Sequence, residues 1–125
     1  MLGEAIVLQD WQTIRREGLA TFSPVFAQHP DRYAGLEGAK TVEVLVQVTH
    51  LTSGITLALE TSPAADKLTW RTSSAFTLTG SHCRVLQRES GRTTDFLEDF
   101  LRWRISYSGS GDWQACFRIV LIPRA

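Results

Sequence analysis

Apolar and polar residues alternate with a period of two along most of the chain. Between residues 41 and 51, every even position from 42 to 48 is valine, and most positions between them are polar. Successive side chains of a strand point to opposite faces of the sheet, so this pattern predicts a half-buried strand. Turn residues follow at 52–54 and alternation resumes, which predicts a hairpin with a second strand over residues 55–60.

The same pattern returns near the C-terminal end. Apolar residues occupy the odd positions from 101 to 107 and again from 113 to 121. The turn between them, at residues 108–112, is rich in glycine and serine. This arrangement predicts a second hairpin whose large apolar side chains all lie on one face.

Shorter alternating stretches predict further strands at residues 5–15, 19–27, 68–72, 75–79 and 83–88. The segment 28–38 contains proline and glycine and is expected to cross from one sheet to the other. Residues 94–99 are expected to form one short helical turn, because the threonine and aspartate at its start can cap it. Roughly seven to nine short strands predict an all-β fold, an antiparallel β-sandwich of jelly-roll type.

The chain has 125 residues, a length typical of one domain, and we assign residues 1–125 to a single β-sandwich. Residues 1–38 supply its first strands and a crossover loop, and are a possible contact arm. Lys and Arg number 13 and Asp and Glu also number 13, so the net charge is zero. Proteins that bind nucleic acid usually have an excess of Lys and Arg on one surface, so this charge balance argues against such a role.

Two cysteines, Cys83 and Cys116, are too few and too far apart for a disulfide framework or a metal motif. We interpret them as structural thiols, with a bridge between them as the open alternative. The longest apolar runs, residues 5–8 and 119–122, fall far short of the roughly 20 residues that span a bilayer. With no secretory signal pattern at the N-terminus, we expect a soluble protein that stays in its cell unless it leaves inside a particle.

No motif in the chain predicts catalysis. The three histidines lie 21 and 32 residues apart, and none has a second ligand-type residue at metal spacing. The acidic group Asp95, Glu98 and Asp99 is interpreted as solvated carboxylates beside the expected helical turn. Nucleophile-elbow and phosphate-loop motifs are absent from the sequence. We therefore expect no catalytic residue, no cofactor and no metal, and the protein is predicted not to be an enzyme.

Arginine is the more informative residue type. If the C-terminal hairpin forms, Arg102, Arg104 and Arg118 share one exposed face with Gln114. Arginine is enriched at protein interfaces, so these four residues are predicted to form a protein-contact face. The alternative is a solvated face whose arginines are neutralised across strands by acids such as Glu43 and Glu60.

The four tryptophans divide by phase with their apolar neighbours. Trp103 and Trp113 are in phase and are predicted to be core residues, and so is Trp70. Trp11 is undetermined, because polar residues flank it. Together with Tyr33 it is a candidate contact residue, or part of an aromatic surface that stacks on sugars.

Two stretches carry a resemblance to a known group of proteins. The first, residues 42–70, contains a valine-rich strand, then Gly54-Ile55-Thr56-Leu57, Leu59-Glu60-Thr61-Ser62-Pro63 and Trp70. The second contains Phe100-Leu101-Arg102-Trp103-Arg104-Ile105, a glycine-rich turn and Phe117-Arg118-Ile119-Val120-Leu121. This pattern, over about residues 40–122, resembles small β-sandwich virion proteins of tailed bacteriophages and of related prophage or gene-transfer particles. The first forty residues show no match to that group.

The resemblance implies a non-enzymatic structural subunit, such as a head decoration, head-to-tail or tail-associated protein. Its expected location is a phage-like particle assembled in the bacterial cytoplasm. Its expected partners are other virion proteins, such as capsid or tail subunits, and further copies of itself, rather than nucleic acid or a membrane. The alternative function, from a different class, is a carbohydrate- or small-ligand-binding β-sandwich module.

Overall fold

The computed structural model describes residues 3–16, 25–27, 33–36, 38–63, 69–89, 91–107 and 112–125. In these ranges the chain forms nine strands and no helix. The strands are β1 (Ile6–Arg16), β2 (Val25–Ala27), β3 (Ala34–Gly35), β4 (Thr41–Leu51), β5 (Ile55–Ser62), β6 (Arg71–Thr77), β7 (His82–Gln87), β8 (Phe100–Tyr107) and β9 (Trp113–Arg124).

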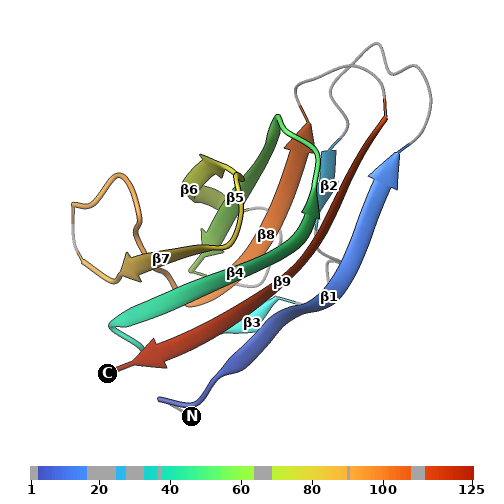
Figure 1. The fold of residues 1–125 in the computed structure, drawn as a ribbon. Coiled ribbons are helices and arrows are strands. Elements are labelled where there is room, and N and C mark those ends of the chain that lie inside the picture. Colours follow the sequence, from blue (N-terminus) through green and yellow to red (C-terminus); the bar gives the residue numbers. More distant parts are fainter. Residues whose placement is uncertain are drawn as a thin grey trace.

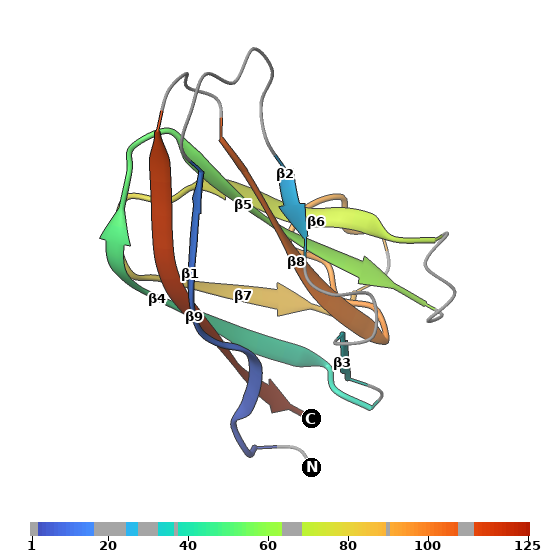
Figure 2. The ribbon, with the colours of Figure 1, turned by 90° about the vertical axis from the view of Figure 1, so that its right-hand side faces the viewer.

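The strands form two antiparallel sheets that pack face to face (Figures 1 and 2). Sheet A has the order β1-β9-β4-β7. Sheet B has the order β2-β8-β5-β6, and the two-residue strand β3 also pairs with β8. In Figure 1 sheet A lies in front of sheet B, so its outer face is turned toward the viewer.

The pairing of the strands identifies the type of sandwich. Apart from β3, the first strand pairs with the last (β1 with β9), and the second with the last but one (β2 with β8). Continuing inward, β4 pairs with β7, and β5 with β6. This is a long double ribbon folded over on itself into two sheets, the arrangement of a jelly roll. The predicted all-β, jelly-roll-like sandwich is therefore confirmed.

The core lies between the sheets and contains the predicted alternating apolar residues. Trp103 and Trp113 are only 2% and 3% exposed, as predicted. Trp103 of sheet B meets Phe117 of sheet A edge to face, with ring centroids 5.0 Å apart. Tyr107 of sheet B likewise stacks on Trp113 of sheet A at 5.5 Å. The apolar stripes of β8 and β9 thus face each other across the core, where aromatic pairs contribute beyond their buried area.

Both predicted hairpins are wrong. β4 belongs to sheet A and β5 to sheet B, so the turn at residues 52–54 carries the chain from one sheet to the other. Gly54, with φ of 92°, adopts the left-handed conformation that this turn requires. β8 and β9 are likewise divided between the two sheets. Alternation specifies which face of a strand is buried, and that face is the same whether the next strand pairs beside it or packs opposite it.

The helical turn expected at residues 94–99 is also not formed. Asp95 has φ of 51°, a left-handed conformation that interrupts a right-handed helix. Its backbone N–H donates to the Ser73 carbonyl of β6 at 2.8 Å, and the Leu97 N–H donates to the Gln87 carbonyl of β7 at 3.0 Å. Phe96 and Leu97 are buried. The segment is thus held between the two edge strands by backbone bonds and by burial of its two apolar residues.

The N-terminal region is part of the sandwich. β1 pairs with β9 from Ile6 to Arg16, so these residues form an edge strand of sheet A. Of the predicted strand 19–27, only β2 falls within the described residues. In the segment 28–38, β3 still belongs to sheet B, so the crossing to sheet A comes after it. Residues 28–32 and 37 lie outside the described residues.

Candidate functional site

The six predicted contact residues divide between the two sheets. Three of them lie on or beside the outer face of sheet B: Arg102, Arg104 and Tyr33. The other three belong to sheet A: Arg118 and Gln114 on β9, and Trp11 on the edge strand β1. The single arginine face expected from a C-terminal hairpin therefore does not exist, because β8 and β9 lie in opposite sheets.

On sheet B, two arginines converge on one carboxylate. Glu60 lies opposite Arg102 in the β5–β8 register, and its Oε1 is 2.8 Å from Arg102 Nε. The Nε of Arg104 is 3.6 Å from the other oxygen, Oε2. The Glu60 side chain is 10% exposed and that of Arg104 is 41% exposed. The alternative interpretation, cross-strand neutralisation by acids, is confirmed for Glu60 with Arg102 and Arg104. It is wrong for Glu43, which pairs with Arg124, while Arg118 pairs with Asp10.

Three aromatic side chains continue this face of sheet B. Tyr33 packs against Phe100 at 5.2 Å and against Trp70 at 6.0 Å between ring centroids. The Arg102 guanidinium lies 4.3 Å from the centre of the Trp70 ring, a cation–π contact. Trp70 is therefore half-buried on the outside of sheet B, and its assignment to the core is wrong. Its ring is inclined by 55° to that of Tyr33, so the two do not form a flat platform for a sugar.

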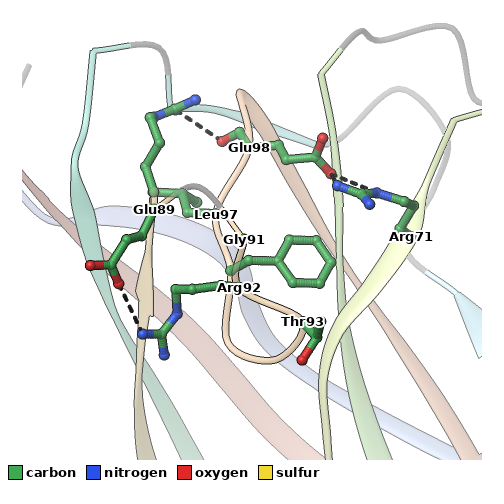
Figure 3. A pocket seen from close by; sticks show the side chains of 9 residues that line it. Arg71, Glu89, Gly91, Arg92, Thr93, Leu97 and Glu98 are labelled. Atoms are coloured by element: carbon green, nitrogen blue, oxygen red, sulfur yellow. Dashed lines mark hydrogen bonds and ion pairs between the residues drawn. The ribbon is translucent and has the colours of Figure 1, made fainter.

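A depression of about 510 Å³ opens between β6 and the segment that follows β7 (Figure 3). Arg71, Arg92 and Phe96 are among its lining residues, and the Arg71 guanidinium lies 4.8 Å from the centre of the Phe96 ring. Arg71 pairs with Glu98 at 3.1 Å, and Arg92 pairs with Glu89 at 3.2 Å. Both guanidiniums are thus already bound to carboxylates of the same chain, so the depression offers no uncompensated positive charge to an anion.

Arg88, at the rim of the same depression, ties three segments together. Its Nη1 is 2.8 Å from the Asp99 carboxylate, and its Nε donates to the Ala39 carbonyl at 2.8 Å. Its Nη2 donates to the carbonyls of Leu36 and Glu98, each at 3.1 Å. A planar guanidinium with several donors is suited to this work. This part of the molecule is therefore a structural clamp.

The outer face of sheet A has a different character, because apolar side chains cross all four of its strands. Cross-strand partners point to the same face. Val7 of β1 pairs with Val120 of β9, Val120 with Leu45 of β4, and Leu45 with Cys83 of β7. In the adjacent row, Glu43 of β4 has two further apolar partners. We call the following six residues the apolar patch: Val7, Leu45, Cys83, Val85, Val120 and Ile122.

The apolar patch is open to solvent. Val7 is 47% exposed and Val85 is 42% exposed, at opposite edges of the sheet. No described segment crosses in front of sheet A (Figure 1). A depression of about 340 Å³ lies where β7 begins, and Leu45 and Cys83 line it. The patch thus has a prominent side chain at the β1 edge and a hollow at the β7 edge.

Ion pairs flank the apolar patch on both sides along the strands. The Glu43 carboxylate lies 3.3 Å from Arg124 Nε, near the C-terminal end of β9. On the other side of the patch, in the middle of β1 and β9, the Asp10 carboxylate lies 3.5 Å from Arg118 Nε. Both pairs are neutral as units, so paired charges border the apolar patch on each side.

Sequence reasoning missed the apolar patch, although its signal is present. A half-exposed antiparallel strand alternates, so an uninterrupted apolar run indicates that both of its faces are apolar. The run at residues 5–8 contains Val7, and the run at 119–122 contains Val120 and Ile122. Leu45 likewise fills the polar position between two valines. A comparison of these runs with the length of a membrane span does not indicate that their strands lie side by side in one sheet.

Both cysteines belong to sheet A and are free thiols. Cys83 is exposed within the apolar patch, whereas Cys116 lies further along β9. Hydrogen bonds from the Thr13 and Thr49 hydroxyls lower the pKa of the Cys116 thiol, because they stabilise the thiolate. The hydroxyls come from the two strands that flank β9 in sheet A.

No protein-family model and no curated protein matches this chain. Within the described ranges, no group of three or more His, Cys, Asp or Glu side chains is placed to hold a metal ion. The described residues likewise contain no helix long and apolar enough to cross a membrane.

Proposed function

We propose that this protein is a non-enzymatic structural subunit that works by binding other proteins in an assembly. The observation that carries the proposal is the apolar patch. Soluble monomers seldom leave contiguous apolar side chains exposed, and such patches commonly mark interaction sites. Here the apolar side chains extend from one edge of the sheet to the other, with polar and charged groups at the ends. An apolar centre with a polar rim is the usual anatomy of a protein interface.

The assembly we propose is a phage or phage-like particle. The support is the sequence resemblance to small virion proteins over about residues 40–122, together with the jelly-roll fold. Jelly rolls form viral capsid domains, but also lectin domains and cupins, so the fold by itself does not select a function. The proposed partners are other virion proteins, such as capsid or tail subunits, and the proposed location is the particle.

The competing candidate is a carbohydrate-binding module built on Tyr33 and neighbouring rings. Its support is the group of three aromatic side chains on sheet B. Two features of that group weigh against it. The Tyr33 and Trp70 rings are strongly inclined to each other, and the Arg102 guanidinium covers one face of Trp70. Trp11, which is 47% exposed, has no described ring contact with Tyr33.

A sedimentation experiment tests the proposal. Purified protein is mixed with the particle fraction from the cells that carry its gene, and the amount that sediments with the particles is measured. The test variant is Val85→Glu in the apolar patch. The matched control is Ala75→Glu, which places the same charge at an exposed position of β6 on the outer face of sheet B.

We expect the wild type and Ala75→Glu to sediment in a fixed ratio to the particles. We expect Val85→Glu to sediment at least about 10-fold less, because a charge in a desolvated contact loses its hydration without gaining a partner. Equal sedimentation of all three proteins at background level would overturn the proposal. Binding on a glycan array that is lost in Tyr33→Ala would favour the carbohydrate module instead.

A further inference from the structure

We propose that the occupant of the apolar patch is a second copy of this chain, with sheet A packed face to face on sheet A around a two-fold axis parallel to the strands. This pairing presupposes that the patch binds protein at all, as proposed above. It adds the identity of one partner and the geometry of the contact. Four arguments support it: the size of the face, its shape, its charges, and the charges that the alternative two-fold axis would bring together.

The first observation is size. Four strands about 4.8 Å apart make a face about 19 Å wide. The strands β1, β9, β4 and β7 have 11, 12, 11 and 6 residues, so at about 3.3 Å per residue the face covers about 630 Å². This area lies at the lower end of the roughly 600–1,000 Å² that each partner buries in an ordinary stable interface. A second copy of sheet A has the dimensions to cover this face completely.

The second observation is shape. A two-fold axis parallel to the strands places β1 of one copy over β7 of the other. Val7 and Cys83 occupy the same cross-strand row, so the prominent Val7 of one copy then faces the hollow beside Cys83 of the other. Two-fold symmetry repeats this contact at the other edge. The axis therefore brings an exposed apolar side chain of one copy over a hollow in the face of the other.

The third observation is charge. The same axis places β4 of one copy over β9 of the other. Glu43 of β4 and Arg124 of β9 already form an ion pair within one chain, with the partners on neighbouring strands at the same end of the sheet. Across the interface, Glu43 of each copy lies over the β9 end that carries Arg124. By the cross-strand register, Glu43 of one copy lies over Ile122 of the other, one row from Arg124, so opposite charges come near each other between copies as well as within them.

Charge also disfavours the other way of stacking the two faces, with a two-fold axis perpendicular to the strands and centred on the apolar patch. A two-fold axis perpendicular to the strands places β9 over β9 with its ends reversed. Arg118 of one copy then lies near Arg124 of the other, and the Val120 and Ile122 positions exchange places. Like charges that meet in an interface cost several kcal/mol. The axis parallel to the strands avoids this repulsion and is the one we propose.

Charge substitutions at the two ends of the row test this geometry. Val7→Glu and Cys83→Lys each place a charge at an exposed position, where the chain accommodates it without loss of the core. Within one chain the two positions are three strand spacings apart, about 14 Å, so they cannot form an ion pair. Across the proposed interface they face each other. Any rescue in the double variant must therefore come from contact between copies.

The measurement is the molar mass in solution by light scattering, from micromolar to millimolar protein. We expect the wild type to be dimeric, each single variant to raise the dissociation constant at least about 10-fold, and Ala75→Glu to leave it unchanged. We expect the double variant Val7→Glu with Cys83→Lys to regain most of the loss. The double variant Val7→Glu with Cys83→Glu should not regain it.

The outcomes separate this inference from the proposed function. A wild type that stays monomeric at millimolar concentration overturns the second copy as occupant, whereas patch-dependent sedimentation with particles then still supports the proposed function. A dimer whose dissociation constant is unchanged in both single variants overturns the proposal that the apolar patch forms the interface. A dimer that shows rescue, from a protein that never sediments with particles, establishes the pairing and refutes the particle proposal.

Discussion

The outer faces of the two sheets differ in how far the chain satisfies its own side chains. On sheet B, Glu60 binds two arginines, and Arg102 in turn lies on Trp70. On sheet A, the apolar patch has no covering segment among the described residues, and its ion pairs lie only at the ends. One face is completed by contacts within the chain, and the other leaves its apolar side chains to be covered from outside. Arginine content alone points to sheet B, the face on which Arg102 and Arg104 already have a carboxylate partner within the chain.

The same difference between the faces applies to the predicted contact residues on sheet B. Arg102, Arg104 and Tyr33 are exposed enough to suggest recognition, yet the contacts of Arg102 and Tyr33 lie within the chain. The residues that a partner would cover are plain aliphatic side chains and one cysteine. Guanidiniums that already contact a carboxylate of the same chain gain less from a partner, although Arg104 Nε and Trp70 Nε1 on this face have no hydrogen-bond partner within the chain. Burial of exposed apolar area contributes about 25 cal/mol per Å².

The largest effect on folding stability is expected on sheet B. Glu60→Gln keeps the shape of the side chain but removes the charge that holds Arg102 and Arg104. Loss of the pair leaves two guanidiniums close together on one face, and we expect the free energy of unfolding to fall by about 2 kcal/mol. Denaturant titration measures it, at constant m-value. A loss below about 0.5 kcal/mol would mean that the face is not held by this carboxylate.

A smaller difference is expected between the two arginines. Arg102 has the 2.8 Å contact with Glu60 and lies over Trp70, whereas Arg104 is 3.6 Å away and 41% exposed. We expect Arg102→Ala to destabilise the fold by about 1.5 kcal/mol and Arg104→Ala by about 0.5 kcal/mol. The same titration ranks them. Equal losses would show that the stacking on Trp70 contributes nothing beyond the ion pair.

Sheet A is expected to tolerate substitution in the separated monomer. Val85→Thr keeps the β-branched shape at an exposed position, so we expect a change within about 0.5 kcal/mol. The titration is done well below the dimer dissociation constant, because association adds apparent stability. A loss above about 1 kcal/mol at that dilution would place Val85 in the fold of the single chain rather than in a contact.

Much of this architecture could be predicted from the sequence, because alternation records burial. The phase of the residues in β4, β8 and β9 gave the correct inner face for each of these strands. Pairing could not be predicted in the same way. The turns at residues 52–54 and 108–112 are short enough for a hairpin, but in this fold they connect opposite sheets. The burial pattern of a strand is identical in both arrangements, so only contacts distant in the chain decide between them.

The contact surfaces were predictable in a more limited sense. Cross-strand pairing suggested Glu43 and Glu60 together as partners of the arginines, and only Glu60 pairs with two of them. The grouping of Arg102, Arg104 and Arg118 failed because it depended on the hairpin. Predicting the apolar patch requires two inferences that the alternating pattern does not provide. Three short apolar runs had to be recognised as two-faced strands, and they then had to be placed side by side, which requires the topology.

The smallest expected effect is on the reactivity of the Cys116 thiol, on sheet A. The Thr13 and Thr49 hydroxyls lower the pKa of this thiol by hydrogen bonding to the sulfur, so the thiolate is more populated near neutral pH than in an ordinary cysteine. A folded-state pKa below the unfolded value adds stability above the unfolded pKa, and this stability is lost as the pH falls through the folded pKa. Alkylation rates measured against pH report that pKa directly.

The experiment uses Cys83→Ser, so that Cys116 is the remaining thiol. We expect the midpoint of its rate profile to lie at a lower pH than that of a free thiol. We expect it to rise in Thr13→Val, which removes the hydrogen bond that lowers the pKa most. Thr13 is exposed on the edge strand β1, so this change leaves the core intact. Dimer formation should slow alkylation without moving the midpoint if the partner only limits access. A midpoint that moves with protein concentration instead would place the partner's side chains against the sulfur, and extend the contact along β9 beyond the apolar patch.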